Sequence, residues 1–169
     1  MDAAELRAMQ APTKERYKQD PAAAVITLKA KGSIDTEGLT CKVETGRALA
    51  VAGLHPATGG SGLELCSGDM LLEALVACAG VTLKSVATAI EVPLNSGNVI
   101  AEGDLDFRGT LGVDKKAPVG FSEIRLRLEV GTDAPQDKLD LLLKLTERYC
   151  VVYQTIKNGP KVAVSMKRV

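Results

Sequence analysis

The sequence predicts an α+β fold in which mostly antiparallel sheets surround one buried central helix. Three observations support this prediction. Residues 70–90 have the composition of a long apolar helix, residues 99–107 and 123–130 alternate apolar and polar side chains as paired strands do, and the expected element order is β-β-β-α-β-β-α-β. The length of 169 residues suits one domain with an arm, so we place an N-terminal helical arm at residues 1–21 and the domain at residues 22–169.

The composition argues against some classes of partner. Lys and Arg together number 21, equal to the 21 Asp and Glu residues, so the chain offers no basic field for a phosphate backbone. With no Trp, two Phe and three Tyr, it also lacks the aromatic side chains of a platform for stacking single strands. We therefore expect no nucleic-acid partner and an aliphatic core.

The cysteines are expected to be thiols. The first residues lack the basic and apolar pattern of a signal peptide, which predicts a cytoplasmic, reducing location. In that location Cys41, Cys66, Cys78 and Cys150 are better explained as thiols than as a disulfide framework. No C-x-x-C pair is present and His55 is the only histidine, so no zinc site is expected.

The N-terminal third is predicted to be a helix followed by three strands. Residues 2–18 favour a short surface helix and an arm that breaks at Pro12 and Pro21. Alternating side chains and glycine-containing turns predict strands at residues 24–29, 39–44 and 47–52, with turns at residues 31–33 and 37–38. Cys41 then falls on the inward face of its strand as an apolar filler.

Residues 53–62 form a glycine-rich loop that leads into the central helix. The loop lacks the spacing and the lysine of a phosphate-binding P-loop. It is either a plain connector or the mouth of a thiol site with His55 as a polar contact, because loops at a scaffold edge often carry function.

The central helix is predicted to begin near Ser67, which can cap free N–H groups, with Asp69 favourably placed at the positive end of the helix dipole. Between residues 70 and 90 only Glu73 and Lys84 are charged, so the helix is apolar nearly all round and should be covered on most sides. Its uncharged run, residues 74–83, is shorter than the roughly 18 to 20 apolar residues that a bilayer core requires. We therefore expect no membrane partner, and a second subunit that helps to cover the helix.

Cys78 lies on this helix and is the candidate reactive thiol. It shares a helical stripe with Leu71, Ala74, Leu75, Val81, Thr82 and Ser85. A free cysteine usually acts as a small buried filler, and a low thiol pKa requires a nearby cation or a helix N-terminus. Cys78 is about ten residues into its own helix, beyond the reach of that helix dipole, so any activation must come from a neighbour in space.

The C-terminal half is predicted to be two antiparallel strands, a helix and a strand. The strands at residues 99–107 and 123–130 each have one wet face, and residues 110–120 turn between them. Residues 133–136 resemble a capping box, after which Leu139, Leu142, Leu143, Thr146 and Cys150 recur at helical spacing. A helix C-terminus disfavours a thiolate at Cys150. Residues 161–166 are expected to be the last strand.

Two segments of the sequence resemble the OsmC/Ohr-type proteins, named for osmotic induction and organic hydroperoxide resistance. One is Leu71-Leu72-Glu73-Ala74-Leu75-Val76-Ala77-Cys78, similar to the family's Leu/Ala-rich helix that ends in its first cysteine. The other is Leu145-Thr146-Glu147-Arg148-Tyr149-Cys150-Val151-Val152-Tyr153-Gln154-Thr155, similar to its second-cysteine segment. The likeness in element order extends from about residue 22 to the C-terminus.

The resemblance implies an intertwined homodimer and an antioxidant activity in the oxidative stress response. Cys78 would be the peroxidatic thiolate that reduces an organic hydroperoxide, and Cys150 would resolve the sulfenic acid as a disulfide. An external dithiol would reopen this disulfide, and no cofactor is implied.

The chain departs from the family at three positions. A Pro-Glu pair near the helix start corresponds to Ser67-Gly68 here, with Asp69 one residue later. The arginine of the early hairpin is absent, and Arg47 is the candidate substitute. The residue after the second cysteine, often proline in relatives, is Val151.

Other readings of the cysteines are also open. Cys66 lies roughly 18 Å from Cys78 along a helix, too far for a disulfide, and is expected to be a filler near the cap. The missing arginine and carboxylate favour a non-catalytic protein of the same fold that binds a small apolar ligand, or a redox-sensing dimer. A structural dimer without a small-molecule site is a third alternative.

Overall fold

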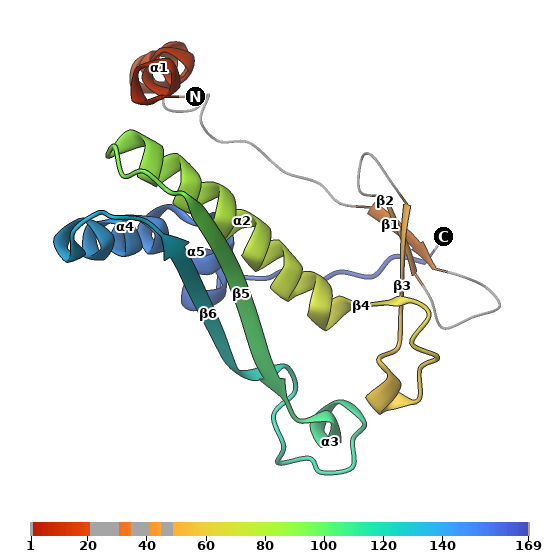
Figure 1. Cartoon of the computed structure of the whole chain (residues 1–169). Coiled ribbons are helices and arrows are strands. Elements are labelled where there is room, and N and C mark those ends of the chain that lie inside the picture. The colour runs from red at the N-terminus through yellow and green to blue at the C-terminus, as the bar shows by residue number, and fades with distance from the viewer. Residues whose placement is uncertain (1, 21–30, 35–40, 45–48, 169) are drawn as a thin grey trace.

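A computed structural model describes residues 2–20, 31–34, 41–44 and 49–168 of the chain (Figure 1). The elements mix helices and strands, which agrees with the predicted α+β class. In chain order they are α1 (Ala3–Gln19), β1 (Lys31–Ile34), β2 (Cys41–Glu44), β3 (Leu49–Gly53), the 3₁₀-helix η2 (Pro56–Thr58), β4 (Leu65–Cys66), α2 (Ser67–Ala89), β5 (Ser96–Leu105), α3 (Phe107–Thr110), β6 (Phe121–Gly131), α4 (Gln136–Tyr149) and α5 (Val151–Asn158).

The strands form two separate sheets. One has the order β1-β2-β3-β4, with antiparallel pairs except for the parallel pair β3 and β4. The predicted turn at residues 31–33 is wrong, because Lys31 to Ile34 pair with β2 as a strand. Pairing along a neighbouring strand there overrides the turn preference of Gly32 and Ser33. The predicted strand at residues 24–29 lies outside the described residues.

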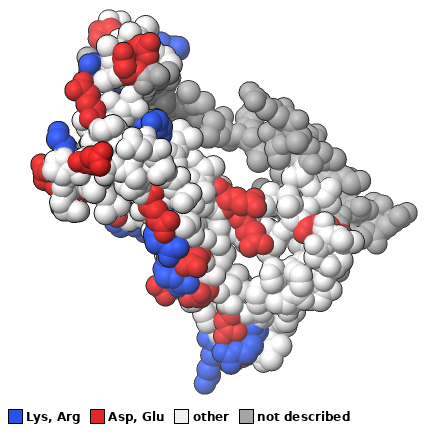
Figure 2. Space-filling view, in the orientation of Figure 1, with Lys and Arg blue, Asp and Glu red and all other residues white. Residues whose placement is uncertain are grey.

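The second sheet is the antiparallel pair β5 and β6, which confirms the clearest alternation in the sequence. Val99 pairs with Leu128 and Ala101 with Leu126, so the apolar side chains share one face. The other face carries charges of both signs, visible along this sheet in Figure 2, with Arg125 near Glu102, Asp104 and Glu123. Strand β5 ends at Leu105, earlier than the predicted residue 107, because Phe107 begins the short helix α3.

The central helix α2 begins at Ser67 and ends at Ala89. Ser67 is therefore its first helical residue and not the predicted cap; Cys66 is the N-cap residue and makes no side-chain capping bond. Asp69 does lie in the first turn, as predicted. Figure 1 shows α2 running beside β5, and it also contacts α4 and α5.

Among the residues that the structure describes, one face of α2 is buried. Its buried residues are Leu75, Ala79, Leu83, Val86 and Ala87, whereas Val81 is 71% exposed. By length and composition alone α2 could cross a membrane, a criterion that the core helix of a globular protein also meets. The second subunit that the sequence predicts as its cover stays a prediction.

The N-terminal helix α1 is longer than predicted and continues through Pro12. A capping box holds its start: the Asp2 carboxylate accepts from the Glu5 N–H at 2.8 Å, and the Glu5 carboxylate accepts from the Asp2 N–H at 2.8 Å. Ala3 and Leu6 are buried, and α1 contacts α2. The predicted break at Pro12 is wrong because these end contacts offset the hydrogen bond that proline cannot donate.

The C-terminal region differs from the prediction in three ways. The predicted capping box at residues 133–136 is wrong, since Pro135 is the N-cap residue of α4 and no side chain caps the helix. A further helix, α5, follows Cys150 directly. The predicted strand at residues 161–166 is also wrong: residues 159–168 have no regular structure and Val162 and Val164 are 81% and 91% exposed. A strand needs a partner strand for its backbone hydrogen bonds, and within the described residues none pairs with this segment.

Candidate thiol site

Cys78 of α2 and Cys150, at the junction of α4 and α5, meet beneath the β5–β6 sheet. Cys150 is 1% exposed and forms a buried core cluster with Leu75 and Ala79 of α2. Cys78, from the middle of α2, is half-buried and packs against the same cluster. The structure therefore brings together the two residues that the sequence selected, although they are 72 positions apart (150 − 78).

Cys150 is the single residue between α4 and α5. Its N–H donates to the carbonyl of Thr146 at 3.0 Å, and its own carbonyl accepts from the Gln154 N–H at 2.9 Å. It thus ends one helix and caps the next. This arrangement directs the first turn of α5, with its free N–H groups, toward α2.

The first turn of α5 stabilises the Cys78 thiolate. Burial by itself raises the pKa of Cys78, but hydrogen bonds from the Val152 N–H, the Cys150 thiol, the Val151 N–H and the Thr82 hydroxyl lower it, and the net result is a lowered pKa. An N-terminal helix turn carries a partial positive charge that favours a thiolate. The sequence correctly required a neighbour in space, and that neighbour is a helix that sequence reasoning missed.

The pKa of Cys150 shifts in the opposite direction. Burial raises it, and the neighbouring Cys78 raises it further by accepting the Cys150 proton in a hydrogen bond and by charge repulsion, which together outweigh the lowering by the Tyr153 and Val152 N–H groups. The sequence predicted that the C-terminus of a helix disfavours a thiolate at Cys150. The structure adds two further causes that raise its pKa, burial and the neighbouring Cys78. The arrangement favours the thiolate at Cys78 and the protonated thiol at Cys150, which suits a nucleophile and a resolving partner.

The other predicted site residues lie elsewhere or outside the described residues. Arg47 falls in the segment 45–48, which the structure does not describe. The backbone of Cys41 lies in β2, but its side chain is also outside the described part of the chain. Asp69 is exposed in the first turn of α2, nine residues and roughly 14 Å along the axis from Cys78. Asp69 and the Cys78 thiol are therefore not neighbours.

His55 and Cys66 line a separate cavity of about 710 Å³. The His55 Nδ1 accepts from the Ala57 N–H at 3.0 Å, and its ring stacks on Phe107 with centroids 5.0 Å apart. Cys66 is half-buried at the start of α2, near the cap as predicted. Neither Cys78 nor Cys150 lines this cavity, so the interpretation of the loop as the mouth of the thiol site is wrong.

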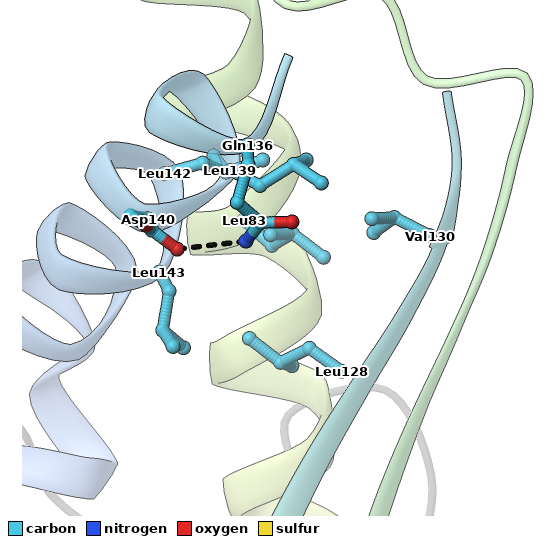
Figure 3. Close-up of a pocket in the computed structure, with 8 residues that line it drawn as sticks. All are labelled: Leu83, Leu128, Val130, Gln136, Leu139, Asp140, Leu142 and Leu143. Atoms are coloured by element: carbon cyan, nitrogen blue, oxygen red, sulfur yellow. Dashed lines mark hydrogen bonds between the residues drawn. The ribbon is translucent and has the colours of Figure 1, made fainter. Parts of the chain in front are cut away.

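Cys150 lines a smaller cavity of about 260 Å³ between β6, α4 and α5, with Leu126, Arg127, Leu128, Leu143, Thr146, Glu147 and Tyr153. A third cavity, of about 180 Å³, lies between α2, α4 and β6 (Figure 3). Leucine side chains dominate its walls, and on α4 the Gln136 Nε2 donates to the Asp140 carboxylate at 2.8 Å. Among the described residues no group of three or more His, Cys, Asp or Glu side chains could hold a metal ion.

The comparisons with known proteins agree with this fold. The family described as "OsmC-like protein" matches residues 59–165, which is more than half of the chain. No curated protein matches the sequence.

Solved structures of low identity share the fold. An OsmC-like protein from Mycoplasma pneumoniae is 15% identical, with a TM-score of 0.65 over 79% of this chain and 89% of that one. An organic hydroperoxide resistance protein OsmC from Legionella pneumophila is 16% identical, with a TM-score of 0.61 over 80% and 92%. OhrB of Bacillus subtilis, an organic hydroperoxide resistance protein, is 18% identical, with a TM-score of 0.52 over 79% and 93%. The chain belongs to the OsmC-like protein family, which is related to the organic hydroperoxide resistance proteins.

Proposed function

We propose that this protein is a thiol-dependent peroxidase that reduces organic hydroperoxides, with Cys78 as the peroxidatic and Cys150 as the resolving cysteine. The observation that carries the proposal is the thiol pair at the start of α5, where the pKa of Cys78 is lowered and that of Cys150 is raised. A thiol peroxidase requires one cysteine that is a thiolate and a second that keeps its proton until it is needed. The apolar neighbours of Cys78 suit a hydroperoxide with an apolar substituent.

The oxidation begins with attack of the Cys78 thiolate on the terminal oxygen of the hydroperoxide. The O–O bond breaks, Cys78 becomes a sulfenic acid and the substrate leaves as an alkoxide. The Cys150 thiol, which is hydrogen-bonded to Cys78, supplies the proton that converts the alkoxide to an alcohol. The resulting Cys150 thiolate attacks the sulfenic sulfur, forms the disulfide and releases hydroxide. An external dithiol then reduces the disulfide, and no bound cofactor takes part.

The decisive experiment is the intact mass of the reduced protein after one equivalent of cumene hydroperoxide, followed by peptide mapping. We expect a loss of two hydrogens at Cys78 and Cys150, and a Cys66→Ser variant should behave like the parent. An unchanged mass, or a Cys78→Ser protein that consumes the hydroperoxide as fast as the parent with a dithiol present, would contradict the proposal.

We also propose that the active form is a cytoplasmic homodimer. Supporting this, α2 exposes Val81, and the C-terminal segment exposes Val162, Val164 and Met166, although all are apolar. A second copy that covers these side chains would also bring in chain segments from the partner. Arg47 is the candidate for an additional cation near Cys78.

The second candidate function is binding of a small apolar ligand without catalysis. The observation that favours it is the cavity of about 710 Å³ near the start of α2, whose walls include Leu72, Leu105, Phe107 and Phe121. Filling this cavity with a Leu72→Trp substitution should then abolish binding of an apolar fluorescent probe, such as anilinonaphthalene sulfonate. Cys78→Ser and Cys150→Ser, which change residues outside this cavity, should leave that binding unchanged.

A further inference from the structure

We propose that the external dithiol opens the Cys78–Cys150 disulfide by attacking the sulfur of Cys150. It would enter through the cavity of about 260 Å³ between β6, α4 and α5, which we call the groove. This inference rests on the proposed peroxidase function and adds the route and direction of the reducing step. Two observations support it: the position of the groove in the fold, and the different surroundings of the two sulfurs.

Cys150 is among the residues that line the groove, although it is 1% exposed, and Cys78 is not among them. The groove's lining residues come from β6, from α4 and from the Cys150–Tyr153 turn, and neither Cys78 nor any other residue of α2 is among them. A thiolate displaces a disulfide sulfur in line with the S–S bond, on the side opposite the leaving sulfur. A groove without α2 residues approaches Cys150 from a side other than that of Cys78, as this geometry requires.

The size and lining of the groove suit a slender reductant. Its volume of about 260 Å³ holds a small dithiol, and its walls combine Leu128, Leu143 and Tyr153 with the charged Arg127 and Glu147. Arg127 is already paired with Glu129 at 3.0 Å, so a net charge on the reductant is not needed for entry.

The two sulfurs also differ as leaving groups. Exchange is faster when the departing thiol has the lower pKa. Burial raises the pKa of both thiols. Hydrogen bonds, among them those from the first turn of α5 and from Thr82, leave the pKa of Cys78 lowered, whereas that of Cys150 stays raised despite the Tyr153 and Val152 N–H groups. Departure of Cys78 regenerates the thiolate that starts the next cycle.

The balanced step has two stages. One thiolate of the dithiol attacks the Cys150 sulfur, the Cys78–Cys150 bond breaks and its electron pair leaves with Cys78 as a thiolate. The second thiol of the reductant loses its proton to solvent. It then attacks the reductant's first sulfur in the mixed disulfide, and the reductant closes to an oxidised cyclic disulfide. Cys150 departs with the electron pair and takes up a proton.

A monothiol can trap the first stage because it lacks the second thiol. The full-length protein is oxidised with one equivalent of cumene hydroperoxide, and the remaining thiols, among them Cys66, are blocked with N-ethylmaleimide. The protein is then treated with 2-mercaptoethanol together with iodoacetamide, quenched in acid and mapped. We expect mercaptoethanol on Cys150 and carbamidomethyl on Cys78.

The opposite assignment is the competing outcome, because Cys78 is the more exposed residue and exposure alone would direct the reagent to it. Mercaptoethanol on Cys78 with carbamidomethyl on Cys150 would overturn the inference and leave the peroxidase function standing. If no Cys78–Cys150 disulfide forms in the oxidation step, the peroxidase function itself fails and the inference fails with it.

A second test obstructs the groove without touching either thiol. Leu143 lines the groove, whereas Leu141, on the same helix and also exposed, does not. Leu143→Trp should slow reduction of the disulfide by dithiothreitol several-fold while the first oxidation stays as fast as in the parent. The matched control, Leu141→Trp, should reduce at the parental rate, and light scattering should give all three proteins the same mass. Equal reduction rates for the two tryptophan variants would rule out this route.

Discussion

Thr82 is the side chain through which α2 itself supports the Cys78 thiolate. Two other helical threonines, Thr88 and Thr146, donate their hydroxyls to the carbonyl four residues earlier, at 2.9 and 2.8 Å. The Thr82 hydroxyl instead donates to the sulfur of the residue four positions earlier, Cys78, and lowers its pKa. Thr88 and Thr146 thus donate their hydroxyl hydrogen bonds to the backbone, whereas Thr82 donates its own to the Cys78 thiolate.

We predict that Thr82→Val raises the pKa of Cys78, since the remaining donors lose the help of one hydroxyl. The rate of iodoacetamide alkylation of Cys78 at neutral pH should fall several-fold, and its dependence on pH should move to higher pH. Thr88→Val is the matched control, because it removes a hydroxyl from the same helix without touching Cys78. Identical pH profiles for parent and Thr82→Val would exclude the hydroxyl from this role.

The lowered pKa of Cys78 also predicts how this thiol affects stability. A group whose pKa is lower in the folded than in the unfolded state contributes stability above its unfolded pKa and loses that contribution as pH falls through its folded pKa. We compare a Cys66→Ser, Cys150→Ser protein, which keeps Cys78, with the same protein that also carries Cys78→Ser. The free energy of unfolding should rise more between pH 6 and pH 9.5 in the protein that keeps Cys78. Urea unfolding at pH 6 and pH 9.5 measures this, and an equal change with pH in both proteins would contradict it.

At the scale of elements, the junction between α4 and α5 decides the chemistry of the site. The α2 helix supplies Cys78, but the Val151 and Val152 N–H groups that hold its charge belong to α5. Proline is tolerated as the first residue of a helix because that N–H makes no bond within the helix. Val151 occupies this position, so its N–H can be removed without breaking α5.

We predict that Val151→Pro keeps the helix but raises the pKa of Cys78. Circular dichroism should be unchanged, while the alkylation profile of Cys78 moves to higher pH. Val151→Ala, which shortens the side chain and keeps the N–H, should retain the parental profile. A shift of equal size in the alanine variant would assign the effect to side-chain packing instead of the N–H group.

At the scale of the whole molecule, apolar surface remains uncovered in a single chain. Val162, Val164 and Met166 alternate along the C-terminal segment and are all highly exposed, as is Val81 of α2. Alternation of this kind is typical of a strand with one buried face. The proposed second copy would cover these apolar side chains.

We predict that the protein measured by light scattering has twice the mass of the chain and that Val164→Asp shifts it toward the monomer. A charge placed on the apolar face of the segment would have to be buried in the interface. Ser165→Asp, one residue later and not part of the apolar alternation, should leave the dimer intact. A parental protein that elutes as a monomer at micromolar concentration would refute the dimer.

The sequence alone was sufficient for the α+β class, the span of α2 and the β5–β6 pair, because each depends on periodicity within a short segment. Cys78 and Cys150 were selected by the family resemblance of their two segments, and their roles stay a proposal. Residues 161–166 also have a clear period, yet they form no strand here, since a strand depends on a partner that local pattern does not specify. The break predicted at Pro12 failed for a similar reason: the contacts of α1 outweigh a local preference. Only the tertiary structure decided which thiol is activated, because the donors on Val151 and Val152 lie on another helix. A pKa depends on which groups meet in space, and the fold brings those donors to Cys78 across more than 70 residues of chain.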